Sequence, residues 1–145
     1  TVELICDGRH IPRDILRLAL MIKGADKVSA ITDGMRIAGT DMQSGKLGSL
    51  KNGTDVIVDD NVAKLPDMSS FAGSIATMDR CLRVLVCDYG IDLLTASKML
   101  STTPAKQIKG ANFGQIKEGL NADLVVADKD FEIVTVIKNG VIGGF

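Results

Sequence analysis

The first third of the chain has the hydrophobic pattern of a strand, a helix and a second strand. β-Branched and apolar residues predominate at positions 2–6 and again at positions 28–32. Between these runs, apolar side chains recur at the spacing of one helix face: Ile15, Leu18, Ala19 and Ile22. Pro12 falls in the first turn of this helix, and Gly24 is its natural end. The pattern predicts a strand, helix, strand unit of an α/β fold, with polar groups at the end of each strand.

The helical period disappears between Asp33 and about residue 65. Glycine recurs in this segment at positions 34, 39, 45, 48 and 53. Two strand-like runs, residues 55–59 and 61–65, predict a hairpin around Asp60. A connection of this length usually covers a functional site or carries a small sheet of its own, and the hairpin favours a small sheet.

Helical periodicity returns at Ser74 and predicts a helix that ends at Gly90. The expected buried face of this helix comprises Ile75, Met78, Leu82, Leu85 and Val86. A second helix is predicted over residues 93–100. Thr103 and Pro104 then have the pattern of a cap and first position of a short third helix.

The end of the chain predicts a small antiparallel sheet. Strand-like runs cover residues 123–127 and 132–138, and the polar residues 128–130 form the turn between them. Asn139 and Gly140 are a further hairpin signal.

Composition narrows the classes of partner and the compartment. Seventeen basic and eighteen acidic residues give a net charge of −1, so no basic surface indicates nucleic acid or a membrane. No apolar run approaches the roughly 18 residues that span a bilayer, and no signal-peptide pattern is visible, so we expect a cytoplasmic protein. Cys6, Cys81 and Cys87 lie in apolar runs without the paired spacing of a zinc site, and we expect reduced core residues.

Candidate chemistry lies at the two predicted strand ends. Asp7, Gly8, Arg9 and His10 follow the first strand, and Asp33 and Gly34 follow the second. In α/β sheets and barrels this is the edge at which catalysis occurs. A carboxylate at the position of Asp33 could act as a general base on a metal-bound water or reach the metal directly. The structural alternatives are an exposed loop histidine and an aspartate that caps a turn.

A third candidate segment comprises Phe71, Ala72, Gly73 and Ser74, directly before a predicted helix. Free amides at a helix N-terminus favour an anion or a sugar hydroxyl, although a serine there is usually only an N-cap. As the sole histidine, His10 cannot build a zinc site from this chain alone. The glycine-rich stretches match neither a P-loop nor a dinucleotide fingerprint.

Several segments, in order, resemble the C-terminal part of the N-acetylglucosamine-6-phosphate deacetylase family within the amidohydrolase superfamily. They are Glu3-Leu4-Ile5-Cys6-Asp7-Gly8-Arg9-His10, Ala30-Ile31-Thr32-Asp33-Gly34-Met35-Arg36, Phe71-Ala72-Gly73-Ser74 with Thr77-Met78, Ser101-Thr102-Thr103-Pro104-Ala105, and residues 114–128. The last segment is shared widely in the superfamily, whereas the first three indicate the narrower family. Many members of that family have Ala where Gly34 stands.

The resemblance implies the last two strands and helices of a (β/α)8 TIM-type barrel in residues 1–112, with a β excursion at about 40–65. Residues 113–145 would form part of a small β-sandwich. It implies that Asp33 is the catalytic carboxylate, which activates the metal-bound water and passes its proton to the leaving amine. Residues 7–10 would be a substrate loop in which His10 contacts the sugar or the acetyl oxygen, and residues 71–74 would close over the substrate.

The resemblance also implies a divalent metal, zinc in the first place, with iron, manganese or cobalt as alternatives. Its ligands, a Glu and two His, would come from earlier strands, and none would come from this chain. Because the chain opens within a strand and not at Met, we expect it to be the latter part of a longer protein. Expected partners are an amino-sugar phosphate, the missing N-terminal part and further copies of the enzyme.

Two other hypotheses remain open at this stage. One is a related amidohydrolase that acts on a different N-acyl or cyclic amide substrate, because fold does not fix function. The other is a non-catalytic fragment that folds by association.

Overall fold

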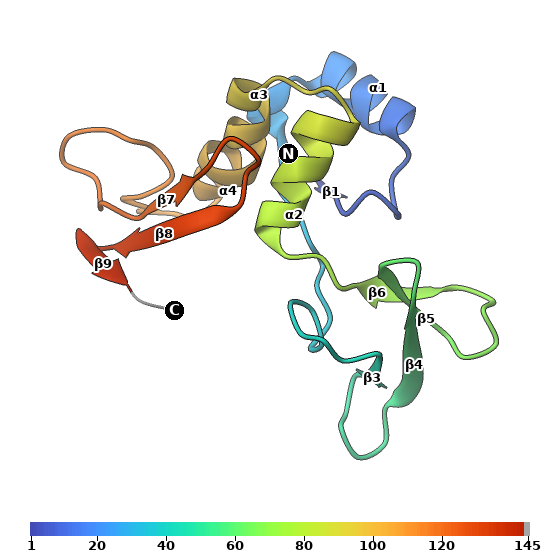
Figure 1. Ribbon diagram of the computed structural model, residues 1–145. Coiled ribbons are helices and arrows are strands. Elements are labelled where there is room, and N and C mark those ends of the chain that lie inside the picture. The colour runs from blue at the N-terminus through green and yellow to red at the C-terminus, as the bar shows by residue number, and fades with distance from the viewer. Residues whose placement is uncertain (144–145) are drawn as a thin grey trace.

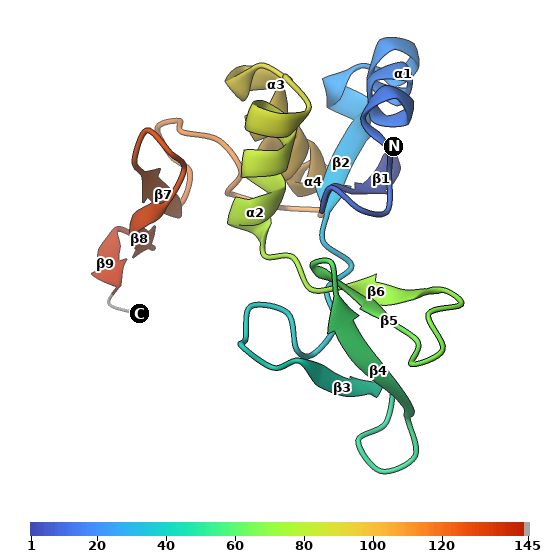
Figure 2. The same ribbon diagram turned by 45° about the vertical axis from the view of Figure 1, so that its right-hand side comes forward.

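The computed structural model describes residues 1–143, in which a parallel strand pair, a group of helices and two antiparallel sheets are found (Figures 1 and 2). β1 (Val2–Ile5) and β2 (Val28–Ile31) run parallel, with Ile5 opposite Ile31. α1 (Arg13–Lys23) and the short η1 (Ala25–Lys27) connect them. The predicted strand, helix, strand unit is therefore confirmed.

The ends of α1 follow from local chemistry. Pro12 immediately precedes the helix instead of lying inside its first turn. Gly24 ends the helix with φ of 73°, a value that L side chains rarely adopt, and its N–H donates to the carbonyl of Leu20.

The segment after β2 forms a four-stranded antiparallel sheet in sequential order: β3 (Ser44–Leu47), β4 (Thr54–Asp59), β5 (Val62–Lys64) and β6 (Phe71–Ser74). The predicted hairpin is β4 and β5, and both residues of its turn, Asp60 and Asn61, have positive φ. β3 and β6 were not predicted. This sheet lies beyond the C-terminal end of β2 (Figure 2).

The helix expected from Ser74 begins later. Ser74 ends β6, and α2 (Met78–Arg83) follows and widens into the π-helical η2 (Val84–Asp88). The later start and the wider turns rotate the buried face, since a π turn spans more residues than an α turn. Leu85 is buried as expected, whereas Met78 is 44% exposed and Cys81 and Val84 are buried instead.

The next helices are one continuous segment: α3 (Leu93–Ser97), the π-helical η3 (Lys98–Thr102) and α4 (Thr103–Ala105). Asp92 caps its start, because its carboxylate accepts the backbone N–H of Thr95. The expected cap at Thr103 is wrong, since Thr103 lies inside the helix and is fully buried. Its hydroxyl donates instead to the carbonyl of Ala25 at 2.7 Å.

The C-terminal sheet is confirmed as β7 (Leu124–Ala127), β8 (Ile133–Lys138) and β9 (Val141–Gly143), paired antiparallel in that order. Asn139 and Gly140, with φ of 50° and 78°, make the tight turn between β8 and β9. The sheet lies beside the helices α2–α4, on the side away from α1 (Figures 1 and 2).

The main core lies between the strand pair and the helices. Its largest fully buried members are Leu16, Leu85, Met99 and Val28. The apolar face that the spacing picks out on α1 is largely exposed: Ile15, Leu18 and Ile22 are 54%, 50% and 71% exposed, and Leu16 is the buried residue of the helix. The three exposed side chains therefore form an apolar row along the outer surface of α1.

Two of the three cysteines are core residues as expected. Cys6 and Cys81 are buried, and burial raises their pKa values to about 12 and about 11. The expectation is wrong for Cys87, which is exposed because η2 turns it outward. Among residues 1–143, no helix has both the length and the apolarity to cross a membrane.

Candidate active site at the carboxyl ends of β1 and β2

The two predicted aspartates occupy equivalent places in the strand pair. Ile5 and Ile31 are register partners, and Asp7 and Asp33 each lie two residues further along the chain. The pairing extends past the strands, because the N–H of Cys6 donates to the carbonyl of Ile31 at 3.1 Å. Parallel strands end at the same edge of a sheet, so both aspartates lie at the edge where α/β proteins place their chemistry.

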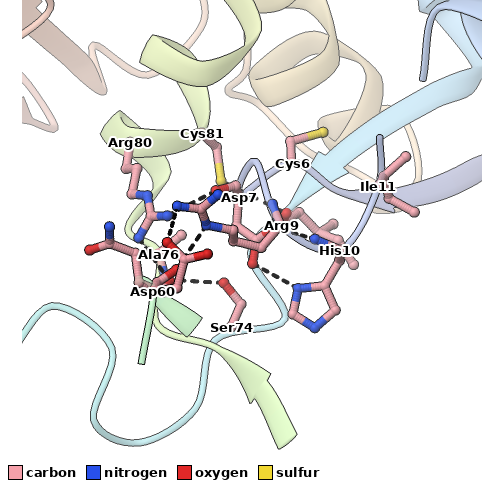
Figure 3. Close-up of polar contacts among 12 residues, drawn as sticks. Cys6, Asp7, Arg9, His10, Ile11, Asp60, Ser74, Ala76, Arg80 and Cys81 are labelled. Atoms are coloured by element: carbon pink, nitrogen blue, oxygen red, sulfur yellow. Dashed lines mark hydrogen bonds and ion pairs between the residues drawn. The ribbon is translucent and has the colours of Figure 1, made fainter. Parts of the chain in front are cut away.

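Asp7 is the organising residue of the loop at residues 7–10. Its carboxylate is fully buried, and Oδ1 accepts the backbone N–H groups of Arg9 and His10 at 2.8 and 2.9 Å. Oδ2 lies 2.7 Å from Nδ1 of His10 (Figure 3). Burial, the largest influence, acts to raise the pKa of this carboxyl, but the hydrogen bonds from His10 and Arg9 together lower it. Gly8 permits the tight loop with φ of 81°.

The imidazole of His10 lies between Asp7 and the third predicted segment. Its ring centroid is 5.1 Å from that of Phe71 in β6, with the ring planes tilted by 58°. The histidine side chain is 17% exposed. Tilted aromatic pairs at this separation attract each other, so Phe71 restricts the ring from a second side.

β6 also lies along the segment that follows β2. Gly34 forms a parallel bridge with Ser74, and the N–H of Met35 donates to the carbonyl of Ser74 at 2.8 Å. The structure therefore brings together three segments that the sequence singled out: residues 7–10, Asp33 with Gly34, and β6. Asp33 itself is exposed, with φ of 46°.

Ser74 does not have the local role that the sequence indicated. It is fully buried in a strand, and its hydroxyl accepts the N–H of Ala76 at 3.0 Å. The N-cap position of α2 is held by Thr77. The expectation of a helix N-terminus at residues 71–74 is wrong, because pairing with β5 holds them extended. The substrate-binding role that the resemblance implies for Phe71, Ala72, Gly73 and Ser74 stays a prediction.

Two arginines attach the four-stranded sheet to this edge, and sequence reasoning missed one of them, Arg80. Arg9 donates from Nε to the carbonyl of Asp60 at 2.8 Å and pairs with its carboxylate. Arg80 donates to the carbonyls of Asn61 and Asp7 at 3.1 and 3.0 Å. Both arginines thus bind the β4–β5 turn (Figure 3). The only sequence signal was the polar turn at Asp60.

Gly73 is the point at which β6 comes closest to the segment after β2. Its φ is 139°, and a Cβ atom there would lie 2.6 Å from Cγ of Met35. We expect Gly73→Ala to lower the free energy of unfolding by about 1–3 kcal/mol through backbone strain, and the crowding of Met35 adds to this. Gly119→Ala is the control, because Gly119 also has positive φ but no atom within 4 Å of its Cβ position. Equal losses in the two variants, measured by urea unfolding, would contradict the close approach.

The site residues do not complete a metal centre. In the described part of the chain, no three His, Cys, Asp or Glu side chains gather closely enough to hold a metal ion. Nδ1 of His10 is already engaged by Asp7.

The fold and the site together define an α/β protein with polar chemistry at the carboxyl ends of parallel strands. Residues 4–143 match the Amidohydrolase family, and the chain belongs to that family. It is 37% identical over 138 residues to the N-acetylglucosamine-6-phosphate deacetylase of Lysinibacillus sphaericus, covering 95% of this chain and 34% of that protein. It is 28% identical to the N-acetylgalactosamine-6-phosphate deacetylase of a Shewanella species, over 92% of this chain and 32% of that protein.

Among solved structures, the chain is similar to the N-acetylglucosamine-6-phosphate deacetylase of Pasteurella multocida. The TM-score is 0.88 at 28% identity, covering 99% of this chain and 36% of that one. The chain thus spans about a third of the length of the relatives it matches.

Proposed function

We propose that this chain is the C-terminal part of an N-acetylglucosamine-6-phosphate deacetylase. The whole enzyme hydrolyses the N-acetyl amide of the sugar phosphate and releases acetate and glucosamine 6-phosphate. The observation that carries the proposal is the meeting at one sheet edge of residues 7–10, Asp33 with Gly34, and β6. The deacetylases reported above, which match nearly the whole chain, support it.

The proposal includes the architecture of the whole enzyme. β1 and β2 would be the last two strands of a (β/α)8 barrel formed by residues 1–112 and an upstream part. Residues 113–145 would contribute strands to a small β-sandwich, and the antiparallel pairing of β7–β9 supports this. The cytoplasmic location and the homo-oligomeric state remain predictions.

Asp33 is proposed to move the protons of the reaction. Its side chain is exposed at the sheet edge, so it can reach a substrate there. Amide hydrolysis requires water to add to the carbonyl carbon and the C–N bond to break. Asp33 takes the proton from the attacking water and delivers it to the departing nitrogen, which leaves as an amine.

The metal in this proposal belongs to the rest of the enzyme. Because the described residues offer no ligand set, the divalent ion, zinc in the first place, would be bound by the Glu and two His expected upstream.

The proposed function is tested by acetate release from N-acetylglucosamine 6-phosphate by the full-length enzyme, meaning this chain joined to its upstream part. The comparison substrates are N-acetylgalactosamine 6-phosphate, unphosphorylated N-acetylglucosamine and a cyclic amide. A preference for the galactose epimer or the cyclic amide would correct the substrate. No hydrolysis of any of them in the metal-loaded enzyme would favour a non-catalytic protein.

We expect His10→Gln in the full-length enzyme to raise KM more than it lowers kcat, with bound metal unchanged. The reason is that His10 is assigned to the sugar and not to the metal. Steady-state kinetics and metal analysis of the purified variant check this. If loss of metal is the main effect, His10 is a ligand and the assigned role is wrong.

A further inference from the structure

We propose that Asp7 is a positioning residue that holds His10 in the tautomer with the proton on Nδ1, so that Nε2 accepts a hydrogen bond from a sugar hydroxyl. The proposal rests on the proposed function for the identity of the sugar. It deepens that function, because the family resemblance left open whether His10 contacts the sugar or the acetyl oxygen.

The first step is the state of the Asp7 carboxylate. It is fully buried, and each of its oxygens is engaged: Oδ1 by two backbone N–H groups and Oδ2 by the imidazole. Backbone N–H groups can only donate, so this environment favours the ionised carboxylate, which can only accept. Nδ1 of His10, 2.7 Å away, must therefore carry a proton.

The second step is the consequence at the other ring nitrogen. In a neutral imidazole with a proton on Nδ1, Nε2 has a free lone pair and is an acceptor. Nε2 lies on the side of the ring away from Asp7 (Figure 3), and within residues 1–143 it makes no hydrogen bond. Phe71 packs against the ring and opposes its rotation. A sugar hydroxyl can donate to such a nitrogen, whereas an acetyl carbonyl oxygen cannot.

The structure also predicts what Asp7→Asn does to the tautomer. The amide oxygen of the substituted side chain must take the place of Oδ1, because two backbone N–H groups point at it. Its NH2 group then takes the place of Oδ2 and donates to Nδ1 of His10. The ring proton is displaced to Nε2, and the acceptor facing the substrate becomes a donor.

The tautomer can be measured directly, because His10 is the only histidine in the chain. We label histidine with ¹⁵N, remove any affinity tag, and record ¹⁵N spectra of the 145-residue chain at a pH where the ring is neutral. The expected result is a protonated Nδ1 in the native chain and a protonated Nε2 in Asp7→Asn. Asp79→Asn is the matched control, since Asp79 is a partly buried carboxylate that pairs with Arg83 and not with His10.

An Nε2–H tautomer in the native chain overturns the proposal, as does a tautomer that Asp7→Asn leaves unchanged. The native spectrum alone decides the tautomer if the variant does not fold, and it is also recorded in the full-length enzyme, because the 145-residue chain alone is expected to self-associate. In the full-length enzyme, the His10 signal is identified by its disappearance in His10→Gln, so the same comparison can be made there.

The kinetic arm uses the full-length enzyme and analogues of the substrate that each lack one ring hydroxyl. We expect Asp7→Asn to lower kcat/KM by about 10- to 100-fold, mainly through KM, because the sugar hydroxyl that donates to Nε2 in the native enzyme faces an N–H donor in the variant and loses that hydrogen bond. For the analogue that lacks the contacting hydroxyl, kcat/KM of the native enzyme should be lower than for the intact substrate by a similar factor. Asp7→Asn should lower kcat/KM for that analogue little further. If every analogue loses as much with Asp7→Asn as with the native enzyme, the hydroxyl contact is wrong. If the native enzyme hydrolyses no amino-sugar phosphate, the proposed function fails while the tautomer result stands.

Discussion

Replacing Asp33 with Asn is expected to lower the turnover of the full-length enzyme by about 10²-fold or more while metal content stays near normal. Asparagine keeps the size of the side chain but cannot take up the proton of the attacking water. The backbone should be unaffected, because Asp33 has φ of 46° and asparagine tolerates this left-handed conformation as well as aspartate does. The measurements are kcat with N-acetylglucosamine 6-phosphate and metal per protomer.

Asp26→Asn is the control for this substitution. Asp26 is an exposed carboxylate that pairs with Lys106 and lies in η1, at the opposite end of β2 from Asp33, so its loss should leave kcat unchanged. Near-normal turnover in Asp33→Asn rules out the assignment of Asp33 as the proton carrier. Loss of the metal together with turnover would instead make Asp33 a metal ligand.

The strand pair could be predicted because its pattern is local. Apolar residues 2–6 and 28–32 flank a segment with helical spacing, and Gly24 marks the break between helix and strand. The same reasoning placed Asp7 and Asp33 at equivalent strand ends, and the register of Ile5 with Ile31 confirms this.

β3 and β6 were missed because their extended conformation depends on partners. β3 contains Ser44, Gly45 and Lys46, which have little strand propensity, and pairing with β4 holds it extended. In β6, Gly73 has φ of 139° and pairs with Ala63. A local pattern specifies an apolar face, but it does not specify which distant strand will pair with it, so the pattern places Ser74 at the start of a helix and not in a strand.

The candidate site was predicted by residue type but not by its connections. The strand-end pattern indicated residues 7–10 and Asp33, the resemblance implied roles for them and for residues 71–74, and the structure brings the three segments to one edge. The contacts of Arg80 with Asp7 and Asn61 join residues 73 and 19 positions apart, and no spacing rule anticipates them. The burial of Asp7 could not be predicted from the sequence either, because aspartate in a loop usually faces solvent.

The exposed apolar residues of α1 indicate a contact with a protein surface outside this chain. Ile15, Leu18 and Ile22 have the spacing of a buried face but are at least half exposed, and Met21 beside them is 84% exposed. Apolar groups in such a row favour contact with another protein surface. The sequence pattern of α1 therefore fits a helix that packs against a neighbour, which in the proposed enzyme the upstream part would contribute.

We expect the 145-residue chain alone to show no acetate release from N-acetylglucosamine 6-phosphate with added Zn²⁺, and to self-associate. Within residues 1–143, β1 and β2 pair only with each other, so each leaves one edge open, whereas a barrel closes only when every strand has two neighbours. Co-expression with the upstream part should restore a metal-dependent deacetylase. The measurements are acetate release, size-exclusion chromatography and binding of a dye that reports apolar surface.

Two variants test whether self-association depends on the exposed face of α1 or on exposed apolar residues in general. Ile22→Glu should reduce self-association of the chain alone and also weaken complementation by the upstream part, because the same face serves both contacts. Met42→Glu replaces another exposed apolar residue, in the connection between β2 and β3, and should affect neither. Robust metal-dependent turnover by the chain alone would overturn the argument, since it would require a complete catalytic site within these residues.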